Sequence, residues 1–279
     1  MIALLLAATL ASSAIQCSMC EGWNAPQKPF RVYGNTWYVG PKGLSSLLIT
    51  SNQGHILVDG ALPQSAAVIA ANIKTLGFRI EDVKLIVNSH AHFDHAGGIA
   101  ELQRLSGAQV AAPAWGARAM QQGDVASDDP QYGDNMAYPA VRQVRVVKDG
   151  ETLHVGPLSV TMHETIGHTP GGASWTWNSC HDGDCKHIVY AESLTAVSHD
   201  SYKFSAHPEM IKGFERSFAA LDKQPCDILV STHPDFSNVF EHLAEREAGK
   251  ANAFIDPTAC KSYVAQARKR LSQRLSKEN

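Results

Sequence analysis

The sequence predicts an α/β protein in which layered β-sheets carry helices on their outer faces, within one domain. Three observations indicate this class. Short β-like runs alternate with helical segments, and both halves of the chain follow that order without a literal repeat. In addition, 44% of the 279 residues are hydrophobic, which is enough for a substantial core.

The first half is expected to begin with antiparallel strands. Between residues 30 and 60, three apolar runs are separated by Gly, Pro and Asn turns, as is typical of such strands. Residues 63–77 have apolar side chains at helical spacing and end at Gly77, so they predict a helix. The elements expected next are a buried strand at 83–89, a helix at 97–107, a strand at 108–113 and a helix at 114–123.

The second half begins after residues 124–140, a polar stretch rich in Asp, Pro and Gly that predicts a long surface loop. The expected elements are β runs at 142–165, a Gly-rich turn at 167–172, a Trp-rich strand at 174–177, a strand at 187–193, a helix at 208–223, a strand at 226–232 and a C-terminal helix. Each half therefore delivers histidines at the ends of strands.

Charge and the N-terminal segment limit the possible partners and location. The 24 basic and 27 acidic residues give a net charge of -3 without a basic block, which argues against nucleic acid as a partner. The apolar stretch at 1–14 is too short to span a bilayer and ends in small residues, which suits signal peptidase. We therefore expect a signal peptide at 1–14 and an exported, periplasmic domain at 15–279 that is monomeric and not membrane-bound.

The six cysteines allow 15 pairings, and an oxidising compartment favours their use. Spacing predicts a Cys180–Cys185 disulfide, because these residues bracket a polar turn. It also predicts a Cys226–Cys260 disulfide, because Cys226 opens an apolar strand and Cys260 precedes the last helix. Cys17 and Cys20 form either a local disulfide or a pair of thiols.

A crowded polar cluster follows the buried strand at 83–89. His90, His92, Asp94 and His95 stand within six positions. Zinc explains the crowding, because it binds neutral imidazoles and a carboxylate together. His90 and His92 share one side of an extended segment and suit one ion, whereas Asp94 and His95 lie where the strand turns into a helix and suit a second. Two Zn²⁺ ions are therefore expected.

The motif "HAHFDHAGG" at 90–98 resembles the signature of the metallo-β-lactamase superfamily, whose fold is an αββα sandwich of two mixed sheets with helices on both outer faces. The resemblance covers nearly the whole mature chain. Its other motifs occur in the family's order: "LVDG" at 57–60, "GHTPGG" at 167–172, "YAESLTAVS" at 190–198 and "STHPDFSN" at 231–238. "GHTPGG", the "SWTW" that follows it and "AESLTA" are most similar to the third subclass of class B β-lactamases.

This resemblance implies a role for each site residue. His90, His92 and His168 would hold the first zinc, and Asp94, His95 and His233 the second. Asp59 would orient a metal-bound imidazole through its free N–H; the alternative is an Asp that initiates the turn before Gly60. From residue pattern alone, His168 and His233 could project into a cleft, but such residues are more often structural histidines. The eight other histidines, His55 among them, are interpreted as surface or turn residues.

The residues at the end of the strand at 187–193 and just after it do not by themselves decide the substrate class. Ser193 and Thr195 are expected to offer hydroxyls to a substrate carboxylate, unless they are merely turn hydroxyls. Glu192 leaves a thioesterase as an alternative, because a shift of the strand register by one residue would turn its carboxylate toward the site. Three tryptophans and the loop at 124–140 are expected to border the cleft, namely Trp23, Trp37 and Trp115. Trp175 and Trp177 are assigned to the core.

The implied reaction is zinc-dependent hydrolysis of the lactam amide in penicillins, cephalosporins and carbapenems, which would confer antibiotic resistance. A hydroxide that bridges the metals would attack the carbonyl, and Asp94 would orient it and return a proton to nitrogen. No G-x-S-x-G or S-x-x-K motif supports a serine nucleophile. The alternatives are a glyoxalase-like thioesterase, a lactonase, or a zinc protein without catalytic activity.

Overall fold

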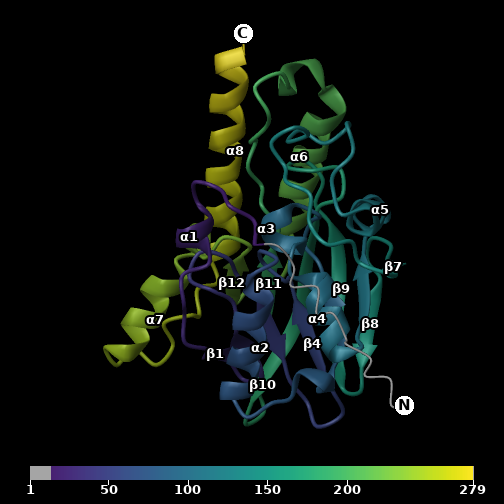
Figure 1. Cartoon of the computed structure of the whole chain (residues 1–279). Helices are drawn as coiled ribbons and strands as arrows, with labels where there is room; N and C mark the ends of the chain where they lie inside the picture. The colour runs from purple at the N-terminus through teal and green to yellow at the C-terminus, as the bar shows by residue number, and fades with distance from the viewer. Residues whose placement is uncertain (1–13, 279) are drawn as a thin grey trace, which may run out of the picture.

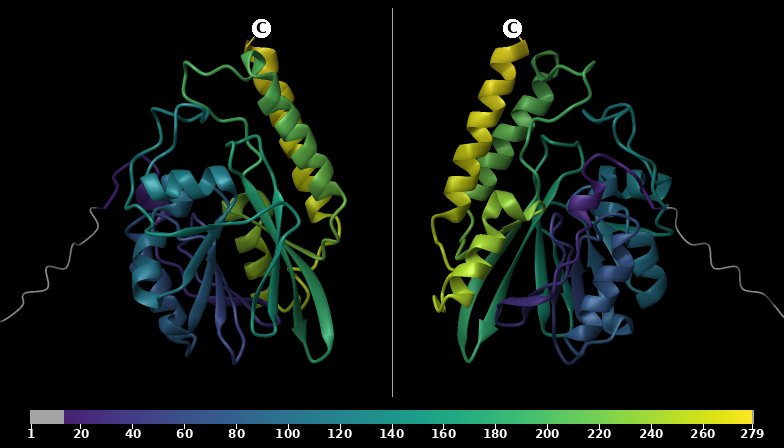
Figure 2. Two further views of the ribbon diagram at one scale, coloured as in Figure 1. Left: turned by 90° about the vertical axis from the view of Figure 1, so that its right-hand side faces the viewer. Right: turned by 60° about the vertical axis from the view of Figure 1, so that its left-hand side comes forward.

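Two mixed β-sheets lie face to face at the centre of the protein, and helices cover the outer face of each sheet (Figure 1). The computed structural model describes residues 14–278. Figure 2 shows the helix, sheet, sheet and helix layers from the side. The predicted αββα class is therefore confirmed. Residues 1–13 of the expected signal peptide lie outside the described residues.

The first sheet has seven strands in sequence order. Its first four strands pair antiparallel and the rest pair parallel. The strands are β1 (Phe30–Tyr33), β2 (Thr36–Tyr38), β3 (Leu47–Ile49), β4 (His55–Val58), β5 (Val83–Val87), β6 (Gln109–Ala112) and β7 (Val144–Val146).

The second sheet has five strands, of which only β11 and β12 are parallel neighbours. In spatial order they are β12 (Ile228–Ser231), β11 (Asp184–Ala191), β10 (Ala173–His181), β9 (Leu158–Glu164) and β8 (Thr152–Val155).

Alternating side chains divide the interior into three apolar layers. In β5, Leu85 and Val87 face the second sheet, whereas Ile86 faces the helices. In β11, Tyr190 lies between the sheets and Val189 packs under helices on the far side. The central strands β4, β5 and β12 are thus buried on two faces, which explains their nearly continuous apolar runs, whereas β8 and β9 alternate buried with partly or fully exposed residues.

The helices fall into groups by the layer they cover. On the first sheet lie α2 (Ser65–Thr75), α4 (Ile99–Ser106) and α5 (Ala114–Gln122), and on the second lie α6 (Pro208–Asp222) and α8 (Ala259–Glu278). The remaining α-helices are α1 (Cys20–Trp23), α3 (Phe93–Ala96) and α7 (Val239–Glu247), and the 3₁₀ turns are η1 (Ile80–Asp82), η2 (Phe204–Ala206) and η3 (Pro234–Ser237). No described helix combines the length and hydropathy that a membrane span requires.

Two expectations about local structure need correction. Helix α7 has no counterpart in the sequence prediction, although Phe240 and Leu243 pack against the core between the sheets. His55 is neither a surface nor a turn residue. It lies buried in β4, with its ring centroid 5.0 Å from that of Phe78. An imidazole can be accommodated there because its Nδ1 accepts a hydrogen bond from the backbone N–H of Ser51.

The structure contains three disulfides. Cys180–Cys185 and Cys226–Cys260 are the pairs proposed from spacing, and Cys17–Cys20 takes the disulfide alternative. The Cys226–Cys260 bond is the only one of the three that joins distant segments, tying the start of β12 to the start of α8.

Replacing Cys226 and Cys260 together by Ala is expected to lower the free energy of unfolding by about 4 kcal/mol, against about 2 kcal/mol for the Cys180 and Cys185 pair. The reason is the closed loop, since the sequence separations are 34 and 5 residues. Urea unfolding of both double variants checks this. An equal loss in the two variants would contradict the loop-entropy explanation.

Candidate metal centre

The candidate site is a cleft of about 340 Å³ at the ends of strands from both sheets. Parallel pairing places these ends side by side. Val58 of β4 pairs with Val87 of β5, and Ala191 of β11 pairs with Ser231 of β12. The segments that leave these strands therefore meet at one edge of the sandwich. The cleft is lined by Trp23, His92, Phe93, Asp94, Gln131, His168, Ser193, Thr195, Val197, His233, Asp235 and Phe236.

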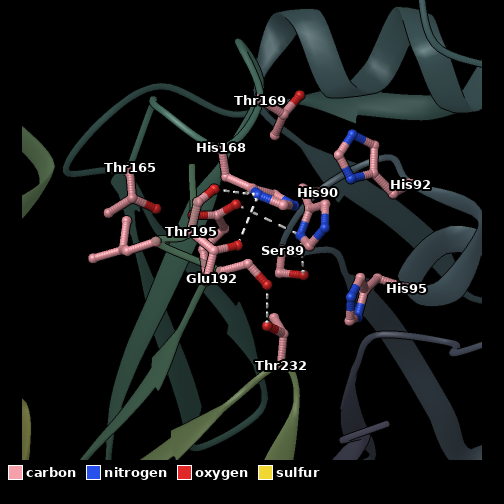
Figure 3. Close-up of polar contacts among 12 residues, drawn as sticks. Ser89, His90, His92, His95, Thr165, His168, Thr169, Glu192, Thr195 and Thr232 are labelled. Atoms are coloured by element: carbon pink, nitrogen blue, oxygen red, sulfur yellow. Dashed lines mark hydrogen bonds and ion pairs between the residues drawn. The ribbon is translucent and has the colours of Figure 1, made fainter. Parts of the chain in front are cut away.

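Three imidazoles from two distant segments form the first group. His90 and His92 follow β5, and His168 lies in the turn between β9 and β10. One ring nitrogen from each lies within 4.8 Å of the others, and all three side chains are buried. Figure 3 shows His90, His92, His95 and His168 gathered around one region. This spacing leaves room for one ion among the three rings, because each ligand need lie only about 2 Å from zinc.

The second group shares His90 with the first. Ligand atoms of His90, Asp94 and His95 also lie within 4.8 Å of one another. His233 adjoins this group, with its Nε2 3.4 Å from Asp94 Oδ2. The Nε2 of His95 is 3.1 Å from the same oxygen. All six residues singled out in the sequence are thus brought together in space.

The chemistry of these groups fits a metal. Among the described residues, nothing forms a hydrogen bond with His90 Nε2 or His95 Nδ1, although both are buried, and His95 Nε2 lies beside the Asp94 carboxylate already described. Burial, with neighbouring imidazoles, holds the pKa of His90 well below its usual value, and burial lowers that of His168 to about 3. Burial alone would raise the pKa of Asp94, but His95 and His233 hold it well below its usual range. Neutral imidazoles beside a carboxylate are the donors that Zn²⁺ prefers.

Asp59 lies behind this cluster rather than in a simple turn. It is fully buried and accepts hydrogen bonds from Asn88 Nδ2 at 2.9 Å, from the backbone N–H and hydroxyl of Ser89 at 2.7 and 2.6 Å, and from the Tyr190 hydroxyl at 2.8 Å. Its Oδ2 is 4.0 Å from His95 Nδ1. Burial raises the pKa of Asp59, and His95 and Ser89 partly offset that effect.

Hydrogen bonds on the outer side of three imidazoles orient their other nitrogens toward the cluster. His168 Nδ1 donates to the carbonyl of Thr195 at 2.8 Å (Figure 3). His90 Nδ1 lies 3.2 Å from Ser89 Oγ, which already donates its proton to Asp59 and so is left as an acceptor. The third ring, His92, meets a carboxylate that the sequence analysis overlooked.

That carboxylate is Asp129, which lies 3.1 Å from His92 Nε2 and also accepts from Thr169 Oγ1 at 2.7 Å. Burial would raise the pKa of Asp129, but His92 lowers it, and Asp129 in turn raises the pKa of His92 against the effect of burial. The loop at 124–140 is irregular as predicted, yet Asp129 within it is buried. Its neighbour Asp128 instead accepts from Trp115, so the sequence carried no signal that separates the two.

Gln131 is the second overlooked residue. Its Nε2 lies 3.3 Å from His92 Nδ1 and 3.1 Å from His168 Nε2, so the amide faces the first histidine group from the opposite loop. Of the tryptophans expected at the cleft, Trp23 lines it. Trp37 packs against Phe78 instead, and Trp115 is buried under the first sheet.

Ser193 and Thr195 both line the cleft, although their hydroxyls have protein partners. Ser193 Oγ is 2.7 Å from Thr232 Oγ1, and Thr195 Oγ1 is 3.2 Å from His168 Nδ1. Glu192 does not turn toward the cleft. It lies behind His90, with Oε1 3.7 Å from Nδ1, the nitrogen that also contacts Ser89. Within the described residues, neither carboxylate oxygen of Glu192 has a hydrogen-bond partner.

Burial, reinforced by Asp59 and Asp129, raises the pKa of Glu192 well above its usual value. A carboxyl of this kind favours the folded state while protonated and loses that contribution as pH rises through its folded pKa. In the metal-free protein, Glu192→Gln is therefore expected to raise the free energy of unfolding by about 1–3 kcal/mol at pH 8 and by much less at pH 5. Urea unfolding at both pH values measures the difference.

The control is Glu164→Gln, which removes an exposed carboxylate from the end of β9. Its effect on stability is expected to stay within about 0.5 kcal/mol. A Glu192→Gln variant that is destabilised equally at both pH values would contradict the prediction.

Comparisons with known proteins agree on one superfamily. Residues 39–181 match the model described as the metallo-beta-lactamase superfamily. The solved structure of Rm3 metallo-beta-lactamase is 53% identical, with a TM-score of 0.93 and coverage of 95% of this chain and 99% of that chain. MEM-A1, a subclass B3 metallo-beta-lactamase isolated from a soil metagenome library, is 47% identical, with a TM-score of 0.89 and coverage of 92% and 98%.

Curated relatives match over shorter stretches. A hydroxyacylglutathione hydrolase from Methylobacterium nodulans is 35% identical over 107 residues, which is 38% of this chain and 32% of that protein. An N-acyl homoserine lactonase from a Bacillus species is 28% identical over 46% of this chain and 55% of its own length. The chain thus spans about a third to just over half of the length of these curated relatives.

Proposed function

Because this chain belongs to the metallo-β-lactamase superfamily, we propose that it is a zinc-dependent β-lactamase that opens the lactam amide of penicillins, cephalosporins and carbapenems at the cleft described above. The structures that match it over nearly their full length are named metallo-β-lactamases, one of them of subclass B3. The third-subclass resemblance noted from the motifs is thereby confirmed. Such an activity would confer resistance to these antibiotics.

The observation that carries this proposal is a buried histidine cluster beside an open cleft. Ring nitrogens of His90 and His95 have no hydrogen-bond partner among the described residues, and His92, His168 and His233 line the cleft. The metal-binding character of the cluster agrees with the family. We further propose two Zn²⁺ ions, one held by His90, His92 and His168 and the other by Asp94, His95 and His233. Bound zinc would polarise the lactam carbonyl and lower the pKa of a water molecule so that it attacks near neutral pH.

The protein's own groups would orient the reactants. Asp94 has a depressed pKa and would be anionic before the reaction, so that it orients the attacking water. It would take up a proton from that water only transiently and pass it to the ring nitrogen as the C–N bond breaks. Ser193 and Thr195, which line the cleft, would donate hydroxyl protons to the substrate carboxylate. Asp129 and Asp59, through His92 and His95, would keep the imidazoles in the required orientation.

The runner-up is a thioesterase or lactonase of the same superfamily, the activities for which the curated relatives are named. The position of Glu192 behind His90 argues against this alternative, because its carboxylate does not line the cleft. We also propose that residues 1–14 are a signal peptide and that the protein is exported to the periplasm. Residues 15–279 would then form one monomeric domain. The three disulfides support an oxidising location.

One experiment tests the substrate class. The purified protein is assayed with nitrocefin, a carbapenem, a glutathione thioester and an acyl homoserine lactone, each with and without a chelator, and its zinc content is measured in parallel. The proposal predicts lactam hydrolysis that the chelator abolishes and added zinc restores. Thioester or lactone cleavage without lactam hydrolysis would support the runner-up instead. Bound zinc without any hydrolysis would indicate a metal protein that is not an enzyme.

A further inference from the structure

The C-terminal helix α8 contacts the segment that forms one side of the cleft. This segment, residues 193–199, follows β11 and is called the cleft wall below. Ser193, Thr195 and Val197 of the cleft wall line the cleft, and Val197 is 51% exposed. Figure 1 shows α8 lying beside α6 along one side of the molecule. The contacts of α8 with the wall lie at both ends of that segment.

The first contact is at the start of the wall. The hydroxyl of Tyr263, a buried residue in the first turns of α8, donates to the carbonyl of Glu192 at 2.7 Å and accepts from the N–H of Leu194 at 3.3 Å. These bonds hold the backbone on both sides of Ser193.

The second contact is at the far end of the wall and involves an ion pair. Arg274 Nη2 donates to Ser198 Oγ at 2.6 Å and to the carbonyl of Tyr202 at 3.0 Å. Its Nε donates to Glu278 Oε1 at 2.6 Å, and its guanidinium carbon lies 5.4 Å from the ring centroid of Phe204. Ser198 directly follows Val197, so Arg274 holds the residue next to the exposed apolar side chain of the wall.

Glu278 completes this anchor. Its Oε2 accepts from the N–H of Ser205 at 2.7 Å and its Oε1 from that of Phe204 at 3.1 Å. The Glu278 side chain is only 5% exposed and that of Arg274 is 27% exposed. The pair therefore lies largely out of water, where the loss of one partner leaves the other charge uncompensated.

The anchored segment also contacts the opposite side of the cleft. The N–H of His199 donates to the carbonyl of Pro130 at 2.9 Å, next to Gln131, whose amide faces His92 and His168. A shift of the cleft wall at Ser198 would thus be transmitted to both sides of the cleft, and its distance from the metal ligands would change.

We propose that Arg274 and Glu278 are positioning residues that hold the cleft wall and thereby set the KM for substrate, without contacting either substrate or metal. This inference rests on the proposed hydrolytic function of the cleft. Arginine suits the role because its planar guanidinium bonds three groups at once, namely Ser198, Tyr202 and Glu278, whereas a lysine ammonium lacks that fixed geometry.

The test uses the full zinc-loaded chain and the variants Arg274→Met, Arg274→Lys and Glu278→Gln. Hydrogen exchange of peptides within 193–205 is measured together with kcat, KM and zinc content. Arg274→Met is expected to speed exchange in these peptides and to raise KM about threefold or more, with kcat within about twofold and zinc content unchanged. Glu278→Gln should change exchange and KM in the same direction as Arg274→Met. The KM of Arg274→Lys should lie between those of Arg274→Met and the wild type.

The matched control is Arg268→Met. Arg268 lies on the same helix, pairs with Glu215 of α6 and stacks over Phe218, and within residues 14–278 it forms no hydrogen bond or ion pair with the cleft wall. Arg268→Met should lower the free energy of unfolding and leave KM within about twofold of the wild-type value. Unchanged exchange in Arg274→Met, faster exchange without a rise in KM, or an equal rise in Arg268→Met would each overturn the inference.

The kinetic substrate is nitrocefin, or the thioester or lactone if the wild type cleaves only one of those. A wrong substrate class would therefore be seen in the wild type before any variant is compared. The KM comparison remains decisive with whichever substrate is cleaved.

Discussion

Replacing Asp94 by Asn is expected to lower kcat/KM for a β-lactam by about 100-fold or more and to remove one of the two zinc ions proposed above. Asp94 brings the only carboxylate into the proposed ligand set, and its Oδ2 lies 3.1 Å from His95 and 3.4 Å from His233. Asparagine keeps the shape but removes the negative charge that offsets a divalent cation. Steady-state kinetics and metal analysis measure the two effects.

The matched control is Asp235→Asn, which removes an exposed carboxylate from the lining of the same cleft. It should keep the zinc content of the wild type. Two tightly bound zinc ions in Asp94→Asn, with hydrolysis close to the wild-type rate, would remove Asp94 from the metal site and from the proposed proton transfer.

The largest loss of stability is expected from Asp59→Ala, at about 3–5 kcal/mol. The change leaves three buried donor residues without their acceptor, namely Asn88, Ser89 and Tyr190. It also places Ala at a backbone φ of 59°, a left-handed conformation that Asp and Asn tolerate better. Urea unfolding of the metal-free protein measures the loss.

Asp59→Asn separates charge from hydrogen bonding. It keeps one acceptor oxygen and the tolerated backbone conformation, so it should cost only about 1–2 kcal/mol. Zinc affinity should nevertheless fall in Asp59→Asn, because Asp59 Oδ2 faces His95 Nδ1 at 4.0 Å and its charge would favour that ring as a ligand. Equal destabilisation by Ala and Asn would show that the hydrogen bonds to the one oxygen that Asn keeps contribute little.

Most of the layered fold followed from local pattern, because apolar periodicity reports directly which face of a helix or strand is buried. The strand at 83–89 and the helices near 63–77 and 208–223 appear as β5, α2 and α6, with ends that shift by a few residues. Helix α7 was overlooked, since it has only nine residues, follows a 3₁₀ turn directly and buries Val239 alone.

Some residues of the candidate site could likewise be found from local sequence, and others could not. His90, His92, Asp94 and His95 stand together in the chain, so their proximity required no knowledge of the fold. His168 and His233 needed the family motifs, because nothing local distinguishes them from structural histidines. The structure places both beside the cluster, since β9 and β12 end, and β10 begins, at the edge where β5 ends.

What the residue order alone established is therefore the alternation of strands and helices, the chemistry of the 90–95 segment and the likeness to one superfamily. The partners of those ligands were established by three-dimensional packing, namely Asp129 on His92 and Glu192 behind His90, and so was the contact of Arg274 with Ser198 of the cleft wall. The physical reason is distance along the chain. These contacts join side chains tens of residues apart, whose approach depends on how two sheets pack and not on any local preference.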